Sequence, residues 1–364
     1  MKVLIAPDKF KGTLSARAAA ESIARGWRMA RPDDTLELQP ISDGGDGFGE
    51  LTSAALGARP QSIGTVDAAH RPCTATWWWD AKTKTALIES ANVVGLAMLP
   101  RGRFHPFDLD TFGLAKILRA ATRRGAAKII IGIGGSATND GGFGLARALG
   151  WIFLDDDGNP ILKWTDLRRL VSIHAPLQLH LADIVVAVDV RNPLLGKHGA
   201  TRIYGPQKGL HLEDLSNAEA NLKRLAAVAK SGRSFASQPG GGAAGGLGFG
   251  LAAFCNAKLH PGFELFVRQT NFRRHIRKAD LVITGEGSID RSTVMGKGVG
   301  ELARLCKEEN VPCIGLGGIT RLPRNRKNLF TSVHALTDLT TAHSAMLKPE
   351  LWLGRLTETV AKCW

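Results

Sequence analysis

Short apolar segments alternate with amphipathic helical segments along much of this chain. Runs rich in Val, Ile and Leu at 2–6, 35–40, 128–133, 280–284 and 312–316 predict buried strands. Apolar positions at helical spacing predict helices over 15–30, 110–124 and 299–309, and Ser15 is well suited to cap the first of them. Strands and helices in this alternation are typical of a parallel α/β fold.

Two further stretches have a different pattern. Residues 60–98 indicate antiparallel strands, with 74–79 and 86–89 as the clearest, and residues 151–265 combine strands such as 184–188 with long glycine-rich loops. We therefore expect an α/β fold with a discontinuous Rossmann-like parallel-sheet domain (1–59, 99–150 and 279–364). A second α/β domain with a mixed sheet (60–98 and 151–278) is expected as an insertion, with the active site in the cleft between them.

The chain is strongly basic, with 47 Lys and Arg against 33 Asp and Glu and a net charge of +14 among 364 residues. Its densest basic cluster is Arg268, Arg273, Arg274, Arg277 and Lys278. A nucleic-acid-binding module is an alternative on charge alone, but neither interleaved aromatics nor a zinc or helix-turn-helix motif accompanies the charge. We expect the charge to attract small anionic substrates, with no nucleic-acid partner.

Five widely spaced cysteines form no CxxC pair, which favours reduced thiols in a cytoplasmic protein. The apolar run at 3–6 is too short for a signal peptide, and the sequence contains no apolar run of about 18 residues, so no membrane partner is expected. The oligomeric state stays open.

Polar, glycine-rich segments follow the predicted strands. The first, 7–12, places Asp8, Lys9 and Lys11 at a strand-to-helix turn, which suits a phosphorylated or carboxylate ligand. The second, 43–47, contains Asp43 and Asp46 among glycines, and paired carboxylates beside phosphates commonly hold Mg²⁺.

The third segment, 132–142, reads GIGGSATNDGG, where a strand ends and a helix is expected to begin. Free backbone N–H groups and the helix dipole favour an anion there. Gly132, Gly134 and Ala137 also fit a loose GxGxxA fingerprint, with 151–154 as the next strand and Asp155 as the ribose-binding acid. That pattern gives an alternative function, an NAD(P)-dependent oxidoreductase. The candidate binding residues here are Gly134, Gly135, Ser136, Thr138, Asn139 and Asp140.

Three later segments complete the set. The segment 189–194 contains Asp189 and Asn192, and 204–209 is expected as a loop that presents Gln207 and Lys208. A polar turn after the strand 280–284 contains Glu286 and Asp290, and Lys297 follows. The chain lacks GxxxxGK[ST] and the protein-kinase motifs, so it is neither a P-loop enzyme nor a protein kinase.

Taken in order, these segments closely resemble one family, the bacterial glycerate kinases that make 2-phosphoglycerate. The resemblance rests on PDKFKG (7–12), DGGDG (43–47), GIGGSATNDGG (132–142), DVRNPL (189–194), GPQKG (205–209), GAAGG (242–246) and TGEG (284–287). It implies ATP as phosphoryl donor, Mg²⁺ as cofactor and D-glycerate as substrate. The chain departs from the family pattern at Asp46, Val188, Ser292 and Val299, where the family usually has Glu, Cys, Gln and Pro.

A mechanism follows from these segments and the resemblance as a hypothesis. Asp189 is the expected base for the attacking hydroxyl, with Asp8 second, and Lys9, Lys11 and Lys208 neutralise the transferred group or the glycerate carboxylate. Asp43, Asp46 and Asp290 are the expected Mg²⁺ ligands. Backbone N–H groups of 134–138 bind phosphate oxygens, and the residues aligned with family binding positions are Asn139, Asp140, Asn192, Gln207, Glu286 and Lys297. Residue spacing does not decide between O2 and O3 of glycerate.

Overall fold

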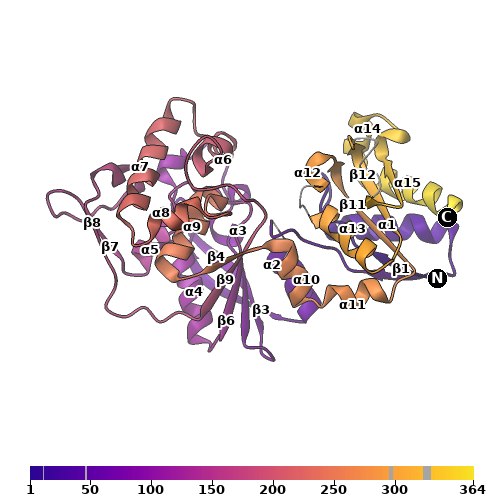
Figure 1. Cartoon of the computed structure of the whole chain (residues 1–364), viewed down its shortest axis with the longest axis horizontal. Coiled ribbons are helices and arrows are strands. Elements are labelled where there is room, and N and C mark those ends of the chain that lie inside the picture. Colours follow the sequence, from indigo (N-terminus) through magenta and orange to yellow (C-terminus); the bar gives the residue numbers. More distant parts are fainter. Residues whose placement is uncertain (11, 46, 295–297, 323–328) are drawn as a thin grey trace. The chain divides into compact units, whose positions relative to one another are not determined.

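The computed structural model describes residues 1–10, 12–45, 47–294, 298–322 and 329–364. The chain divides into two compact units, which are coloured along the sequence in Figure 1. The split unit comprises Met1–Asp43 and Phe263–Trp364, and the inserted unit is the continuous segment Gly44–Gly262. The prediction of a parallel-sheet domain interrupted by a mixed-sheet domain is confirmed.

The split unit is built on a five-stranded parallel sheet in the order β13-β12-β11-β1-β2. Val3 and Ile5 pack with α1 and α15 in one apolar cluster. Leu4, which alternates with them, is also fully buried, so both faces of the sheet are covered, as a parallel sheet requires. The strands are β1 (Lys2–Ile5), β2 (Thr35–Leu38), β11 (Leu281–Ile289), β12 (Cys313–Thr320) and β13 (Ser332–Ala335). The helices are α1 (Ala16–Ala30), α10 (Gly262–Gln269), α11 (Phe272–Arg277), α12 (Arg291–Val294), α13 (Gly298–Glu308), α14 (Ala342–Leu347) and α15 (Pro349–Cys363).

The inserted unit contains a six-stranded mixed sheet in the order β10-β9-β6-β5-β4-β3. Neighbours from β10 to β5 are parallel, whereas β5, β4 and β3 form an antiparallel meander. The strands are β3 (Arg59–Val66), β4 (Pro72–Asp80), β5 (Thr85–Glu89), β6 (Lys128–Gly132), β9 (Asp183–Val188) and β10 (Lys258–Pro261), with β7 (Ile152–Leu154) and β8 (Ser172–His174) in a separate antiparallel pair. The helices are α2 (Phe48–Leu56), α3 (Ala91–Val94), α4 (Leu114–Arg123), α5 (Phe143–Ala148), α6 (Ala200–Lys208), α7 (Asp214–Val228), α8 (Gly232–Ser237) and α9 (Ala243–Cys255), and the 3-10 helix η3 (Trp164–Arg169) packs against α7.

The unit boundaries differ from the predicted ones. The segments 44–59 and 99–150 were expected in the parallel-sheet domain, but both belong to the inserted unit, and 263–278 belongs to the split unit. β6 belongs to the sheet of the inserted unit, because it pairs with β5 on one side and β9 on the other. An apolar run predicts a buried strand but does not specify its neighbours, which are chosen by pairing between residues far apart in sequence.

Two segments expected as loops are regular structure. Residues 204–208 form the last turns of α6, and β11 continues through Glu286 to Ile289. The strand continues because β12 is also rich in glycine and pairs closely with it, with Glu286 opposite Gly317. A Cβ atom on Gly285 would lie 2.3 Å from the Leu316 carbonyl oxygen, so a glycine is required at this close approach.

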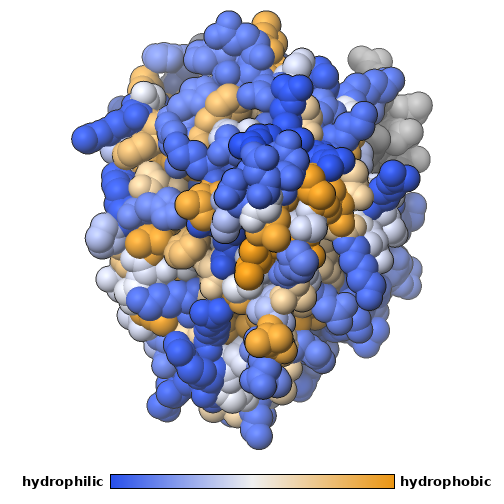
Figure 2. Space-filling view, turned by 90° about the vertical axis from the view of Figure 1, so that its left-hand side faces the viewer, coloured by the Kyte–Doolittle hydropathy of each residue, from blue (hydrophilic) through white to orange (hydrophobic). Residues whose placement is uncertain are grey.

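The surface shows no single dominant apolar area on the face drawn in Figure 2, where hydrophobic residues lie in small groups between hydrophilic ones. Among the described residues, none of the helices combines the length and the apolar composition needed to cross a bilayer.

Candidate active site

In the split unit, three carboxylates interact near the carboxyl ends of neighbouring strands. Asp8 follows β1, Asp43 follows β2, and Glu286 lies in β11. Burial first, then the negative charge of Asp43 and a smaller effect of Glu286, raise the pKa of Asp8 to about 8, although the N–H and the ammonium of Lys9 oppose the shift. The Lys9 N–H donates to Asp8 Oδ1 at 2.7 Å. The charges of Asp43 and Glu286 thus act on Asp8 in the same direction, towards its protonated form.

Asp290 does not share this arrangement. Its carboxylate accepts hydrogen bonds from the Ser292 N–H and hydroxyl, both at 2.7 Å, and from the Ser288 hydroxyl at 3.0 Å. These bonds hold the turn from β11 into α12. Thr293 in α12 donates instead to Glu286 Oε1 at 2.6 Å, so α12 positions the Glu286 carboxylate. Asp46, Lys11 and Lys297 lie outside the described residues.

In the inserted unit, Asp140 holds the glycine-rich loop 132–142 in place. Its carboxylate is fully buried and accepts from the Thr111 hydroxyl at 2.7 Å, the Thr111 N–H at 3.0 Å and the Gly144 N–H at 2.9 Å. Burial and the neighbouring Asp110 raise its pKa to about 6, while these hydrogen bonds oppose the shift. Asp140, which was expected to bind a ligand, therefore accepts its hydrogen bonds from Thr111 and Gly144 of the same unit.

The same loop leaves backbone donors available. Ala137 N–H donates to the Val94 carbonyl oxygen at 2.7 Å, and Thr138 N–H donates to Ser136 Oγ at 3.1 Å. The N–H groups of 134–136, by contrast, have no acceptor among the residues that the structure describes. Three successive N–H donors beside a strand end can bind an anion. Of the five N–H groups predicted to do so, these three are suited to it.

Helix α6 contacts the predicted loops along one face. Residues at positions i, i+3 and i+7 lie on the same side of a helix, and here each of them is bonded to a residue of a predicted segment. Asn139 Nδ2 donates to Thr201 Oγ1 (3.0 Å), the Tyr204 hydroxyl donates to Asn192 Oδ1 (2.7 Å), and Lys208 Nζ donates to the Thr138 carbonyl oxygen (2.7 Å). Sequence analysis missed α6, because Gly205, Pro206 and Gly209 indicate a turn, although the spacing of 201, 204 and 208 was a helical signal.

Lys208, the last residue of α6, is buried beside the loop 132–142. Its ammonium group lies in an environment that lowers its pKa to about 7, because burial disfavours the charged form, and the nearby Asp140 only partly offsets this effect. A lysine in such surroundings gains its full charge when an anion binds beside it. Gln207, the neighbouring candidate, is exposed.

A second glycine-rich segment, 242–246, packs directly on the loop 132–142. A Cβ atom on Gly245 would lie 1.9 Å from the Thr138 carbonyl oxygen, and the φ angle of Gly245 is +69°. A Cβ on Gly242 would lie 2.1 Å from the Pro193 carbonyl oxygen. The segment 242–246 therefore packs between the 132–142 loop and the 189–194 loop.

Asp189 and Asn192 lie in the loop after β9. The Asp189 side chain is exposed, and its charge contributes to raising the pKa of Tyr204. Asn192 is bonded at both ends of its amide, since it accepts from Tyr204 and its Nδ2 donates to the His198 carbonyl oxygen at 2.7 Å. Helix α6 is thus bonded to the loop that contains Asp189 and Asn192 and, through Lys208, to the loop 132–142.

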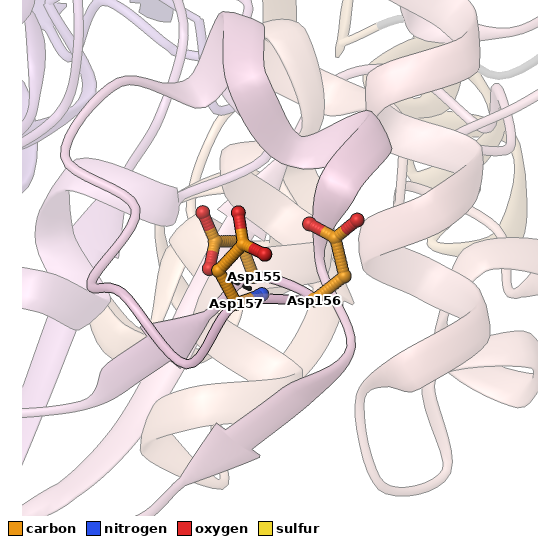
Figure 3. A group of neighbouring side chains, drawn as sticks. All are labelled: Asp155, Asp156 and Asp157. Atoms are coloured by element: carbon orange, nitrogen blue, oxygen red, sulfur yellow. Dashed lines mark hydrogen bonds between the residues drawn. The ribbon is translucent and has the colours of Figure 1, made fainter.

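The dinucleotide-binding alternative is not supported by the geometry. A Rossmann fingerprint requires the strand after the glycine-rich loop to lie in the same parallel sheet, but β7 pairs with β8 in a separate antiparallel sheet. Asp155, expected to bind ribose, lies with Asp156 and Asp157 in a tight turn (Figure 3). Its Oδ2 pairs with Arg169 at 3.0 Å, and its Oδ1 accepts from the Asp157 and Asn159 N–H groups.

The basic cluster is also partly neutralised. Arg273 pairs with Glu308 and Glu309 at 2.8 and 2.9 Å, and Arg277 pairs with Glu309 at 2.7 Å. These ion pairs with the end of α13 reduce the charge that phosphates of a nucleic acid could contact.

Comparisons with known proteins agree with one another. A model described as the glycerate kinase family matches residues 3–364. A glycerate kinase of Halalkalibacterium halodurans is 38% identical over 322 residues, covering 87% of this chain and 85% of that protein. A glycerate 2-kinase of Escherichia coli K12 is 39% identical over 324 residues, with the same coverage of 87% and 85%. A crystal structure described as a candidate glycerate kinase 2 from Salmonella typhimurium LT2 has a TM-score of 0.81 at 34% identity, and covers 100% of this chain and 98% of that one.

The parallel sheet of one unit and the mixed sheet of the other, both covered by helices, define an α/β fold. The chain belongs to the glycerate kinase family. It is an ATP-dependent kinase that acts on glycerate, and no comparison supports the oxidoreductase alternative.

Proposed function

We propose that this enzyme transfers the γ-phosphoryl group of ATP, bound with Mg²⁺, to the 2-hydroxyl of D-glycerate, which gives 2-phosphoglycerate and ADP. One observation carries the anion-binding part of the proposal. The buried Lys208 ammonium lies 2.7 Å from the Thr138 carbonyl oxygen, on the same loop whose N–H groups at 134–136 have no acceptor among the described residues. A buried cation and aligned N–H donors are suited to the developing charge of a transferred phosphoryl group.

Asp189 is proposed to accept the proton of the attacking hydroxyl. It is exposed at the end of β9, and α6 holds its loop beside Lys208. Asp8 is the less suitable base, because a carboxyl with a pKa of about 8 is largely protonated at neutral pH. Asp8 is proposed instead to serve as a ligand of a cation.

The split unit is proposed to hold the Mg²⁺. Of the predicted Mg²⁺ ligands, Asp43 is kept in this proposal. Asp8 and Glu286 are proposed in place of Asp290, because the charges of Glu286 and Asp43 both act on Asp8, whereas Asp290 accepts hydrogen bonds from Ser288 and Ser292. Carboxylate oxygens are suitable Mg²⁺ ligands. When bound, the ion would neutralise charge on the β- and γ-phosphates.

The decisive experiment measures ADP release by the purified protein with Mg-ATP and D-glycerate. The product is then offered to enolase without phosphoglycerate mutase. Direct conversion to phosphoenolpyruvate establishes phosphorylation at O2. Conversion that requires the mutase would show that O3 is the acceptor. An absence of glycerate-dependent ADP release from folded protein would overturn the assignment to this substrate.

A further inference from the structure

The chain contains one tyrosine, Tyr204, and the predicted site residues did not include it. Its hydroxyl lies 2.7 Å from Asn192 Oδ1, and Asn192 Nδ2 lies 2.7 Å from the His198 carbonyl oxygen. A carbonyl oxygen can only accept, so the NH₂ group of the amide faces His198 and its oxygen faces Tyr204. The phenol must therefore donate, and the orientation of this hydrogen bond is fixed.

Asn192 fixes its loop at more than one point. Besides its side-chain bonds, its backbone carbonyl oxygen accepts from the Gly242 N–H at 2.9 Å. The loop between Asp189 and His198 is thus tied to α6 and to the 242–246 segment. Glu219 of α7 also accepts from the Gly196 N–H of this loop at 2.7 Å, but the bond to Asn192 itself comes from a side chain of α6, so Tyr204 links the position of Asn192 to that of α6.

Tyr204 is half-buried and close to Asp189. Burial first, and then the negative charge of Asp189, raise the pKa of Tyr204 to about 12. A phenol of that pKa stays neutral throughout the working pH range and neither gives up nor takes the substrate's proton. Tyr204 must therefore contribute by positioning other groups.

The same helix holds Lys208 one turn further on. Lys208 is bonded to the loop 132–142, whereas Tyr204 is bonded to the loop that contains Asp189. Positions i and i+4 lie on one helix face, so the distance between the two loops depends on one rigid element. Small displacements of reacting groups cost large factors in rate.

We propose that Tyr204 is a positioning residue for phosphoryl transfer: by donating to Asn192 it holds the 189–194 loop so that the Asp189 carboxylate faces the acceptor hydroxyl of glycerate. This inference rests on the proposed function, in which Asp189 is the base.

The first test is a double-mutant cycle. Tyr204→Phe keeps the ring and removes only the hydroxyl, and we expect kcat to fall about tenfold, with the KM for ATP within twofold of wild type. In an Asp189→Asn background the same substitution should change kcat by less than twofold, because the group that it positions is already disabled. Lys223→Ala, at an exposed position of the neighbouring helix α7, is the control and should leave kcat within twofold. Multiplicative losses in the double mutant, or an unchanged kcat in Tyr204→Phe, would overturn the proposal.

The second test needs no substitution at Tyr204. Growth with 3-fluorotyrosine labels this residue alone, so folded protein gives one ¹⁹F resonance. We expect that resonance to shift in Asp189→Asn and to stay in place in Lys223→Ala. An unmoved resonance in Asp189→Asn would refute the link between the two residues. Because this measurement is made on the free protein, it gives its answer even if wild-type protein shows no glycerate kinase activity, which would count against the proposed function instead.

Discussion

Two buried aspartates, one in each unit, show how differently the units use negative charge. Asp140 in the inserted unit is fully buried, yet the hydrogen bonds from Thr111 and Gly144 keep its pKa near 6. Asp8 in the split unit is also buried, but it faces Asp43, and its pKa rises to about 8. The ionised Asp140 carboxylate is stabilised by hydrogen bonds within its own unit. For Asp8, burial and neighbouring negative charge favour the protonated form.

This contrast extends to the surroundings of each residue. In the inserted unit, backbone segments around the loop 132–142 pack so closely that a glycine is required at 245, and Asn139 Nδ2 and Lys208 Nζ are hydrogen-bonded to neighbouring segments. In the split unit, three carboxylates lie at neighbouring strand ends, where burial and like charge raise the pKa of Asp8. We infer that close backbone packing fixes the glycine-rich loops of the inserted unit, whereas the carboxylates of the split unit are placed to bind a cation.

The largest effect is expected at Gly245. Replacing it by Ala places a Cβ 1.9 Å from the Thr138 carbonyl oxygen and should lower the free energy of unfolding by about 3–5 kcal/mol, with loss of turnover. Chemical denaturation followed by circular dichroism measures the change.

Gly57→Ala is the matched control for that substitution. Gly57 has nearly the same backbone conformation, with φ 65° and ψ 27°, and a Cβ there meets no atom within 4 Å. It should cost only about 1–2 kcal/mol, the penalty of a left-handed conformation. Equal costs at the two positions would show that the interlocking of the 242–246 segment contributes nothing.

The next largest effect is expected at Lys208. Lys208→Met keeps the length and apolar stem of the side chain but removes the cation, and we expect turnover to fall about 100-fold. Stability should change little, because burying the uncharged thioether avoids the cost that lowers the lysine pKa. Steady-state kinetics and thermal melting distinguish the two effects. Lys197→Met, an exposed lysine of the same unit, should leave both unchanged.

A pH-dependent effect is expected at Asp8. Since its pKa is about 8 in the folded state against 3.8 in the unfolded chain, the folded state binds more protons between these values. Stability attributable to Asp8 should therefore decrease as pH rises from about 4 to 8, and Asp8→Asn should be more stable than wild type at pH 8 by up to a few kcal/mol. Thermal melting across pH measures this difference.

Added Mg²⁺ should oppose the loss of stability that is expected as the pH rises. A divalent cation favours the ionised carboxylates, so added Mg²⁺ should raise the wild-type melting temperature more at pH 8 than at pH 6. Asp8→Asn should reduce this increase, while Asp290→Asn should not. A Mg²⁺ effect that depends on Asp290 rather than Asp8 would restore the ligand set expected from sequence.

The smallest effect is expected at the acidic turn 155–157. Asp156 is exposed and paired with Arg169, so Asp156→Asn should change turnover by less than twofold. Binding of NADH, followed by its fluorescence, should be absent in both proteins. Saturable NADH binding lost in an Asp155 variant would revive the dinucleotide alternative.

Much of the fold was predictable because apolar periodicity is a local property. The strand at 2–6, the helix capped by Ser15 and the meander within 60–98 were all confirmed, and Ser15 Oγ does accept from the Ala18 N–H at 3.1 Å. The family was predictable because its segments are specific and occur in order, and the match over residues 3–364 confirms it.

Only the tertiary structure decided which strands share a sheet and which polar groups remain available. β6 joined β5 and β9, against expectation, because strand pairing depends on residues distant in sequence. Asp140 and Asp8 are the same residue type in similar polar segments, but Asp140 accepts long-range hydrogen bonds, whereas burial and then like charge raise the pKa of Asp8. The sequence by itself therefore determined the chemical groups and the family, whereas packing determined their partners, because hydrogen bonding and burial depend on neighbours that the chain brings together only when it folds.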